Sequence, residues 1–267
     1  MKTFSFILML FVYSNLFSQV NPSDSPFYET MRTLNPSDRE ALVYKEIING
    51  NVPSYMHHFV TIHTKQRDAK GVKHKVTLFV APDYLSIGND TATFLIPMMP
   101  VTAQRIADTL RCSLPTPKVV DIIYQHATLK LEPFNYIPRG NRNETPDIWN
   151  DHSRTVFAQM KAAGEKPGVF VAGTKKDIVI SSKLEDSLRT HHVIIYGWHR
   201  LNGTPIQPVY NKHLDTYVDY SHGVRLVSNN VIVDGKEYDY RTILRNPLLY
   251  TLLSNEPKPM KRISYTR

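Results

Sequence analysis

The stretch HHVIIYGWHR, residues 191–200, decides the fold class. Branched apolar residues from Val193 to Ile195 are followed by Tyr196 and Trp198, and residues of these types favour β-strands. Similar short apolar runs recur through the last hundred residues, at 168–173, 177–181, 209–227 and 230–240. The turn VDGK at 233–236 is typical of a hairpin. The C-terminal part of the chain is therefore predicted to be mainly β.

The first half of the chain combines a hairpin with helices. Period-two runs flank the turn-like QRDAKGVK at 66–73 and predict a β-hairpin. Capping residues and apolar spacing predict helices from Ser37, Thr102 and Thr116, and two more over 151–163 and 240–254, the last interrupted at Asn246–Pro247. Residues 132–150 are predicted to be a loop. We expect an α+β fold: a single domain, mixed helices with a mainly antiparallel C-terminal β-sheet.

The N-terminus is typical of an exported protein. Residues 1–19 carry Lys2, then an apolar run from Phe4 to Val12, then a polar exit. This pattern predicts a signal peptide that is too short to span a membrane, with cleavage after Ser18 or Gln19. Residues 20–54 form an N-terminal arm with one helix, and residues 55–267 form the α+β domain. No second long apolar run follows, so we expect a secreted protein, periplasmic or extracellular, without a transmembrane segment.

The net charge indicates the kind of partner. The formal charge is +8 and the sequence pI is about 9.4. Such a surface favours polyanions. Export argues against nucleic acid, and no run of Lys and Arg is longer than two. An anionic wall polymer, an extracellular polysaccharide or a phospholipid surface fits better, although a merely soluble basic protein has the same composition. We expect no cofactor, and the sequence does not indicate an oligomeric state.

Cysteine and histidine usage suggests candidates for catalysis. Cys112 is the one cysteine, so it is buried and inert, paired between molecules, or a free reactive thiol. A thiolate nucleophile needs a lowered pKa, which the start of the helix at Thr116 and a nearby imidazole would supply. Five of the eleven histidines lie between residues 191 and 222, and His192 heads an apolar strand. His192 is therefore the best-placed base.

Two segments resemble the NlpC-type, papain-like wall hydrolases. KKDIVISSKLEDSLRTHHVIIYGWHRLNG, residues 175–203, is similar to that family's strand pair, and RCSLPTPKVVDIIY, residues 111–124, is similar to its nucleophile segment. The resemblance implies Cys112 as nucleophile and His192 as base, with His199 or Gln207 as the orienting polar residue. The Asp and Gly that flank the family's cysteine are absent here.

A second resemblance involves YSHGVRLV, residues 220–227, which is similar to the SHGCIR signature of wall L,D-transpeptidases. Val224 stands where that family has its nucleophilic cysteine. Either the match is accidental, or the scaffold binds without that chemistry.

The same region also offers metal ligands. His213, Asp215, Asp219 and His222 supply nitrogen and oxygen donors of the kind that Zn²⁺ accepts. On an unbroken strand, His222 would lie on the opposite face from the other three, so a bulge would be needed. Asp219, Ser221 and Arg225 would share one face, suited to an ion pair or to binding a carboxylate.

Three functions follow from these candidates. The first is a secreted hydrolase of amide bonds in a cell-wall or extracellular polymer, and the others are a non-enzymatic protein binding anionic polymer and a metal-dependent hydrolase using His213, Asp219 and His222. The catalytic candidates are Cys112, His192, His199 and His222. The substrate-binding candidates are Lys176, Trp198, Gln207, Asp219, Ser221 and Arg225.

Overall fold

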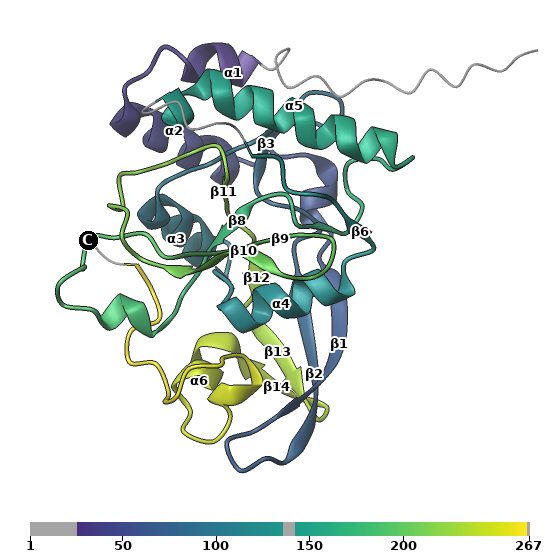
Figure 1. The fold of residues 1–267 in the computed structure, drawn as a ribbon, viewed down its shortest axis with the longest axis vertical. Helices are drawn as coiled ribbons and strands as arrows, with labels where there is room; N and C mark the ends of the chain where they lie inside the picture. Colours follow the sequence, from purple (N-terminus) through teal and green to yellow (C-terminus); the bar gives the residue numbers. More distant parts are fainter. Residues whose placement is uncertain (1–25, 136–141, 266–267) are drawn as a thin grey trace, which may run out of the picture.

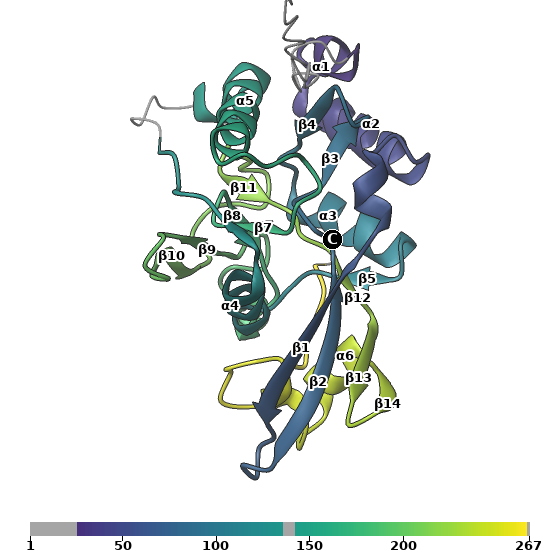
Figure 2. The ribbon, with the colours of Figure 1, turned by 90° about the vertical axis from the view of Figure 1, so that its right-hand side faces the viewer.

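The larger of the two main sheets joins segments from both ends of the chain. In the computed structural model, which describes residues 26–135 and 142–265, its order is β14-β13-β2-β12-β5, with β1 on the other edge of β2 (Figures 1 and 2). All its pairs are antiparallel. The strands are β1 (Val60–Arg67), β2 (Lys73–Val80), β5 (Cys112–Ser113), β12 (Val227–Ser228), β13 (Asn230–Val233) and β14 (Lys236–Asp239). The two predicted hairpins are confirmed.

The smaller sheet is made by the C-terminal half of the chain. Its order is β10-β9-β8-β11, and only the pair of β11 with β8 is parallel. Its strands are β8 (Lys176–Ile178), β9 (Ile195–His199), β10 (Pro205–Tyr210) and β11 (His222–Gly223). Two further strand pairs are β3 (Ser86–Gly88) with β4 (Thr93–Leu95), and β6 (Leu129–Lys130) with β7 (Val171–Ala172).

Helices surround these sheets. The α-helices are α1 (Pro26–Met31), α2 (Pro36–Ile48), α3 (Pro100–Thr109), α4 (Pro117–His126), α5 (Pro146–Ala162) and α6 (Tyr240–Arg245). Short 3-10 helices are η2 (Ser54–His57), η3 (Arg142–Glu144), η4 (Ser182–Glu185) and η5 (Tyr250–Leu252). In Figures 1 and 2, α1, α2 and α5 lie at one end of the molecule, and α6 lies at the other beside the β1–β2 hairpin. The predicted α+β class is confirmed.

Local signals predicted the start of α4 and the end of α6 correctly. The Thr116 side chain caps α4 by accepting from the amide of Val119, and Pro247 ends α6 as expected. Three starts differ. Asn35, not Ser37, caps α2, α3 begins at Pro100 instead of being capped by Thr102, and α5 begins at Pro146 instead of residue 151. In all three cases a proline occupies the first turn, where its missing N–H costs nothing and its fixed φ suits a helix.

The N-terminal arm is part of the body. It contains two helices where one was predicted, because the six-residue α1 is too short to show a clear period. Met31, Val43 and Ile47 are buried in the same core as Val80 of β2 and Ile195 of β9. The predicted signal peptide, residues 1–19, lies outside the described residues.

The long strand predicted over 209–227 does not form. Residues 211–221 are mainly turns and loops with one isolated bridge at Leu214, and the paired segments are the end of β10, β11 and the start of β12. The side chain of Asp219 accepts from the amide of Ser221, which is a turn that competes with strand pairing. The alternation of faces expected for Asp219, Ser221, His222 and Arg225 is therefore wrong.

Within the residues that the structure describes, no helix combines the length and the apolar character needed to cross a membrane.

Candidate functional site

Two loops meet where they enter the parallel strands of the smaller sheet. β8 pairs with β11 so that His222 lies opposite Lys176, and the Lys176 amide donates to the carbonyl of Ser221 at 2.7 Å. Since parallel strands run in the same direction, the residues before β8 lie beside those before β11. Polar side chains gather at this point, and we call them the β8–β11 polar centre. Its members are His152, Lys175, Lys176, Asp219, Ser221 and His222.

Asp219 is the fixed negative charge of the centre. Its Oδ1 accepts from the amide of Ser221 at 2.7 Å and from the Ser221 hydroxyl at 2.5 Å, and its Oδ2 accepts from the Tyr217 hydroxyl at 3.2 Å. Burial raises the pKa of Asp219, but the charges of His222 and Lys176 and the bonds from Ser221 outweigh this and hold it at about 2. The Ser221 hydroxyl is thus committed to a weakly basic carboxylate, which leaves it unactivated as a nucleophile.

His222 is fully buried, and neither of its ring nitrogens has a hydrogen-bond partner among residues 26–135 and 142–265. Its Nε2 lies 4.0 Å from Oδ1 of Asp219, beyond hydrogen-bond reach, and the edge of the Tyr217 ring packs near it. Burial lowers the pKa of His222 to about 4, so the ring is neutral at neutral pH. A buried polar group left without a partner costs about 1–3 kcal/mol. The imidazole therefore keeps one donor and one acceptor unused within the described structure.

Lys175 and His152 form the inner part of the centre. The Lys175 ammonium donates to the carbonyl of Tyr220 at 2.6 Å and lies 3.4 Å from Nδ1 of His152, which comes from α5. Burial lowers the pKa of Lys175 to about 7, and the same cause lowers the pKa of His152. Much of the Lys175 amine is therefore uncharged at neutral pH, as is common for lysines in active sites.

Lys176 and Trp198 form an outer side of the centre. The half-buried Lys176 holds its Nζ 5.0 Å from the centroid of the Trp198 ring, a cation–π contact. The Trp198 indole N–H donates to the carbonyl of Thr174 at 3.0 Å, which fixes the ring. Burial lowers the pKa of Lys176, and the charge of Asp219 opposes this effect. Trp198, Lys176 and Asp219, all named as substrate-binding candidates from the sequence, thus lie close together.

An unusual backbone in β9 separates Trp198 from its neighbours. Gly197 and Trp198 both have positive φ, 100° and 56°, and a bulky residue rarely adopts this conformation. The break in alternation lets Tyr196 and His199 contact the same carboxylate, that of Asp121, while Trp198 faces Lys176. His199 therefore does not orient any residue of the polar centre.

Arg225 supports the centre from within the core. Its guanidinium donates to the carbonyls of Ala81 at 2.9 Å and Val171 at 2.7 Å, and it lies over the ring of Tyr84. The Tyr84 hydroxyl in turn donates to Asp177 at 2.9 Å. Arg225 is 1% exposed. We therefore expect it to position β11, in place of the substrate-binding role and the Asp219 ion pair considered from the sequence.

Two buried carboxyls accompany Arg225. Burial raises the pKa of both Asp83 and Asp177 to about 6, although the charge of Arg225 acts in the opposite direction on each.

Gly223, the residue after His222 on β11, packs directly against Tyr84. A Cβ atom at this position would lie 2.5 Å from the Tyr84 ring, so a larger residue would force the ring to move. The Tyr84 ring therefore packs closely against β11, the strand that carries His222.

Cys112 lies in the other sheet. It is buried on β5, where its Sγ contacts the carbonyl of Leu110 and its backbone pairs with Ser228. Burial raises the pKa of its thiol to about 12, and the charge of Arg241 compensates only in part. No hydrogen bond or ion pair in the described part of the chain links it to a histidine, including His192, which bridges to Leu214. The structure thus does not assemble the cysteine–histidine pair.

Two other candidates lie at or beyond the edge of the centre. His213 stacks on Tyr217 with ring centroids 4.3 Å apart, and Tyr217 also contacts His222. Gln207 lies on β10, opposite Gly197, and its amide donates to a neighbouring carbonyl.

Among residues 26–135 and 142–265, no three His, Cys, Asp or Glu side chains are close enough to hold a metal ion. The proposed ligands His213, Asp219 and His222 do not form such a group.

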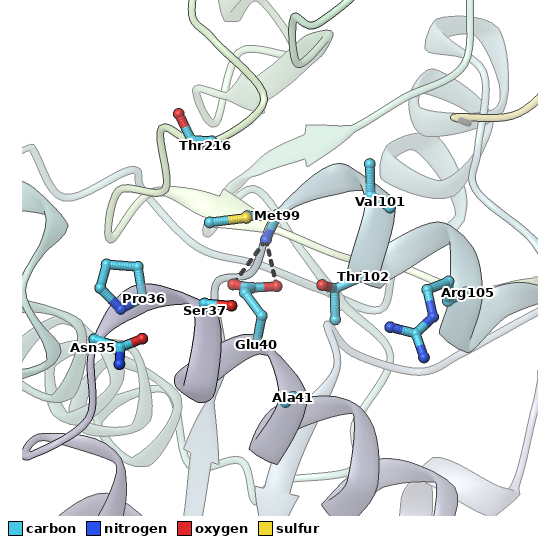
Figure 3. Close-up of a pocket in the computed structure, with 10 residues that line it drawn as sticks. All are labelled: Asn35, Pro36, Ser37, Glu40, Ala41, Met99, Val101, Thr102, Arg105 and Thr216. Atoms are coloured by element: carbon cyan, nitrogen blue, oxygen red, sulfur yellow. Dashed lines mark hydrogen bonds between the residues drawn. The ribbon is translucent and has the colours of Figure 1, made fainter. Parts of the chain in front are cut away.

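A cavity of about 630 Å³ borders the loop that leads into the centre (Figure 3). It lies between α2, α3 and Thr216, the residue before Tyr217. Both carboxylate oxygens of Glu40 accept from the amide of Met99 at 3.1 Å, at the start of α3. The other lining residues are Asn35, Pro36, Ser37, Ala41, Val101, Thr102 and Arg105.

Comparisons with known proteins found no match: no protein-family model fits the chain, and neither a curated protein nor a solved structure is significantly similar to it.

Sequence reasoning missed His152 and Tyr217. His152 lies on the buried face of α5 with Trp149 and Val156, so a polar residue at an apolar helical position was the available signal. Tyr217 gave no signal, because its contacts depend on the turn at Asp219.

Proposed function

We propose that this protein is an exported hydrolase that cleaves amide or ester bonds by general base catalysis, with His222 as the base. The observation that supports this best is the buried, neutral imidazole of His222, which lies 4.0 Å from the carboxylate of Asp219 and has no hydrogen-bond partner on either nitrogen within the part of the chain that the structure describes. A structural histidine in a core is normally hydrogen-bonded. An orphan imidazole beside a fixed carboxylate fits a group that acts on a substrate.

The proposed reaction uses water as nucleophile. His222 accepts a proton from water as the oxygen attacks the carbonyl carbon, and the ammonium of Lys176 stabilises the negative charge that develops on the carbonyl oxygen. The imidazolium then returns the proton to the leaving nitrogen or oxygen as its bond to carbon breaks.

Asp219 makes this base effective. Burial lowers the pKa of His222 to about 4, and the charge of Asp219 acts in the opposite direction, so the ionised carboxylate favours the imidazolium as it forms. Hydrogen bonds in active sites are often long before substrate binds and shorten in the complex. We expect the 4.0 Å separation between the two side chains to shorten in this way.

The substrate reaches His222 past two aromatic side chains. His213 and Tyr217 are half-buried, stack on each other and lie against the fully buried His222. Entry requires Tyr217 to turn away, which breaks its bond to Asp219. The cavity at Thr216 would then accept a neighbouring part of the polymer. The substrate class that we propose is a wall or extracellular polymer, in keeping with the predicted signal peptide.

The test is hydrolysis by the mature protein. Purified protein is incubated with isolated peptidoglycan and with acetylated polysaccharide, and new amino groups, released acetate and soluble fragments are measured. We expect His222→Gln to reduce the rate by at least 100-fold, the lower range for loss of a general base. His191→Gln is the matched control, because His191 is an exposed histidine outside the centre.

A second control separates the mechanisms. Cys112→Ser should retain full activity. If Cys112→Ser is inactive while His222→Gln is active and folded, the proposed base is wrong. If the wild-type protein releases no product from any of these polymers, the hydrolase proposal fails.

The β1–β2 hairpin favours a second function, binding of an anionic polymer. Its register places Lys65 opposite Lys75 and Arg67 opposite Lys73, and all four side chains are exposed. Like charges directly opposite each other destabilise a sheet unless a counter-charge is present. Asp234 contacts the backbone amide of Lys75, and no ion pair of these four cations is found in the described part of the chain.

Salt-dependent binding tests this second function. A variant with all four cations changed to Gln should elute from heparin-agarose at clearly lower salt than wild type. The control changes the exposed Lys45 and Lys161 to Gln, which reduces charge elsewhere. Equal elution of the two variants would show that the hairpin is not the binding surface.

A further inference from the structure

A second cavity, of about 500 Å³, lies between α4 and the β9–β10 hairpin. It lies apart from the polar centre, because the unusual backbone at Gly197 and Trp198 directs Trp198 to one site and His199 to the other. The residues on which the argument rests are Asp121, Tyr124, Gln125, Tyr196, His199 and Asn202, all of which line it.

Asp121 is held in place as a hydrogen-bond acceptor. Its Oδ1 accepts from the Tyr196 hydroxyl at 2.8 Å and from Nε2 of His199 at 3.0 Å. Both bonds end on the same oxygen. Within the described residues, no hydrogen bond involves Oδ2, and the Asp121 side chain is 34% exposed. The free oxygen is therefore fixed in direction and open to a ligand, which reduces the entropy lost on binding.

The surroundings of Asp121 are aromatic and amide side chains. Tyr124 stacks on His199 with ring centroids 4.5 Å apart, and its hydroxyl donates to the carbonyl of Arg200 at 2.6 Å. The side-chain amides of Gln125 and Asn202 also line the cavity and supply both donors and acceptors. The Asn202 Oδ1 accepts from the amide of Thr204 at 2.9 Å. The rings are thus anchored, while the Gln125 amide and the NH₂ group of Asn202 are left to face the cavity.

This combination selects the chemical class of ligand. An anion would be repelled by Asp121, and a cation would compete with Lys130, whose ammonium lies 5.2 Å from the centroid of the Tyr124 ring. A neutral molecule with several hydroxyls satisfies the carboxylate and both amides, and its C–H face packs on an aromatic ring.

We infer that this cavity binds a neutral sugar residue, with Oδ2 of Asp121 accepting from a sugar hydroxyl. The inference does not depend on hydrolysis at His222. If both proposals hold, the cavity provides a sugar subsite on the same protein.

The experiment measures binding of four neutral tetrasaccharides, chitotetraose, cellotetraose, mannotetraose and xylotetraose, by saturation-transfer NMR and calorimetry. We expect at least one to bind in the millimolar range or tighter, and Asp121→Ala to weaken it at least 10-fold. Tyr196→Phe, which removes one of the two bonds that hold Asp121, should have a smaller effect in the same direction. His222→Gln should bind like wild type.

Asp215→Asn is the matched control, because it removes a carboxylate beside His191 and away from the cavity. Absence of binding by all four sugars at 10 mM, on the order of the weakest affinity that the argument allows, would overturn the inference. Equal binding by folded Asp121→Ala and wild type would do the same. Neither result bears on the hydrolase proposal, which the His222→Gln rate tests separately.

Discussion

Replacing His222 by Leu tests whether its imidazole is truly without partners, and the test needs no substrate. The side chain is fully buried, and neither ring nitrogen has a hydrogen-bond partner among the described residues. Removing an unsatisfied buried polar group recovers about 1–3 kcal/mol. A change of shape at nearly constant volume costs less than about 1.5 kcal/mol. We therefore expect the free energy of unfolding at pH 7, measured in urea, to be unchanged or higher by about 1–2 kcal/mol.

The pH dependence gives a second measure of the same side chain. The pKa of His222 is about 4 in the folded protein and about 6.5 unfolded, so the unfolded state binds more protons between these values. Stability is therefore present above pH 6.5 and is lost as the pH falls towards 4, on the order of 3 kcal/mol from this group. In His222→Leu, this part of the acid loss should disappear.

His152→Leu is the control. His152 is equally buried but contacts Lys175, so we expect its loss to destabilise the fold by about 1–3 kcal/mol. The reasoning about His222 is refuted if His222→Leu is destabilised by more than about 2 kcal/mol, the range for loss of a satisfied group. The same holds if His222→Leu loses as much stability between pH 6.5 and pH 4 as the wild type does.

Gly223→Ala should lower the free energy of unfolding by about 1–3 kcal/mol, because its Cβ would lie 2.5 Å from Tyr84, and urea titration measures this; full stability would mean that the Tyr84 ring moves freely. Cys112 should resist iodoacetamide in the native protein at pH 8 and react in urea, since its thiol is buried with a pKa of about 12, as mass spectrometry of labelled protein would report. Rapid native labelling would contradict the described burial. Asp83→Asn and Asp177→Asn should each flatten the stability profile between pH 4 and 6: the folded pKa of about 6 lies above the unfolded value, so each carboxyl stabilises the fold below pH 4 and this contribution is lost as the pH rises through 6. Urea unfolding at pH 4 and pH 7 measures the change in the free energy of unfolding. A variant whose stability changes with pH as much as that of the wild type would show that burial does not raise the pKa of that carboxyl.

Local features of the fold were predictable because they depend on neighbours in the sequence. The cap at Thr116, the break at Pro247 and the turn at 233–236 act over a few residues, and each formed as expected. The starts of α2, α3 and α5 were displaced by a few residues, since a proline in the first turn decided them more strongly than the polar residues that follow.

The candidate site was predictable only in part. Lys176, Trp198, Asp219, Ser221 and His222 do come together, yet the alternation used to place them failed. Period two holds only for paired, extended backbone. One side chain, that of Asp219, bonds to the backbone two residues on and converts the expected strand into a turn.

By itself, the sequence determined the fold class, the capped helices, the two hairpins and the segment that carries the polar centre. Only the tertiary structure decided which polar groups are buried together. The parallel pair of β8 and β11 sets Lys176 opposite His222, and α5 contributes His152 from another part of the chain. The same folding buries Cys112 in the other sheet and raises the pKa of its thiol. The reason is physical: the protonation state of a side chain depends on its desolvation and on nearby charges, and these come from residues that are distant in sequence.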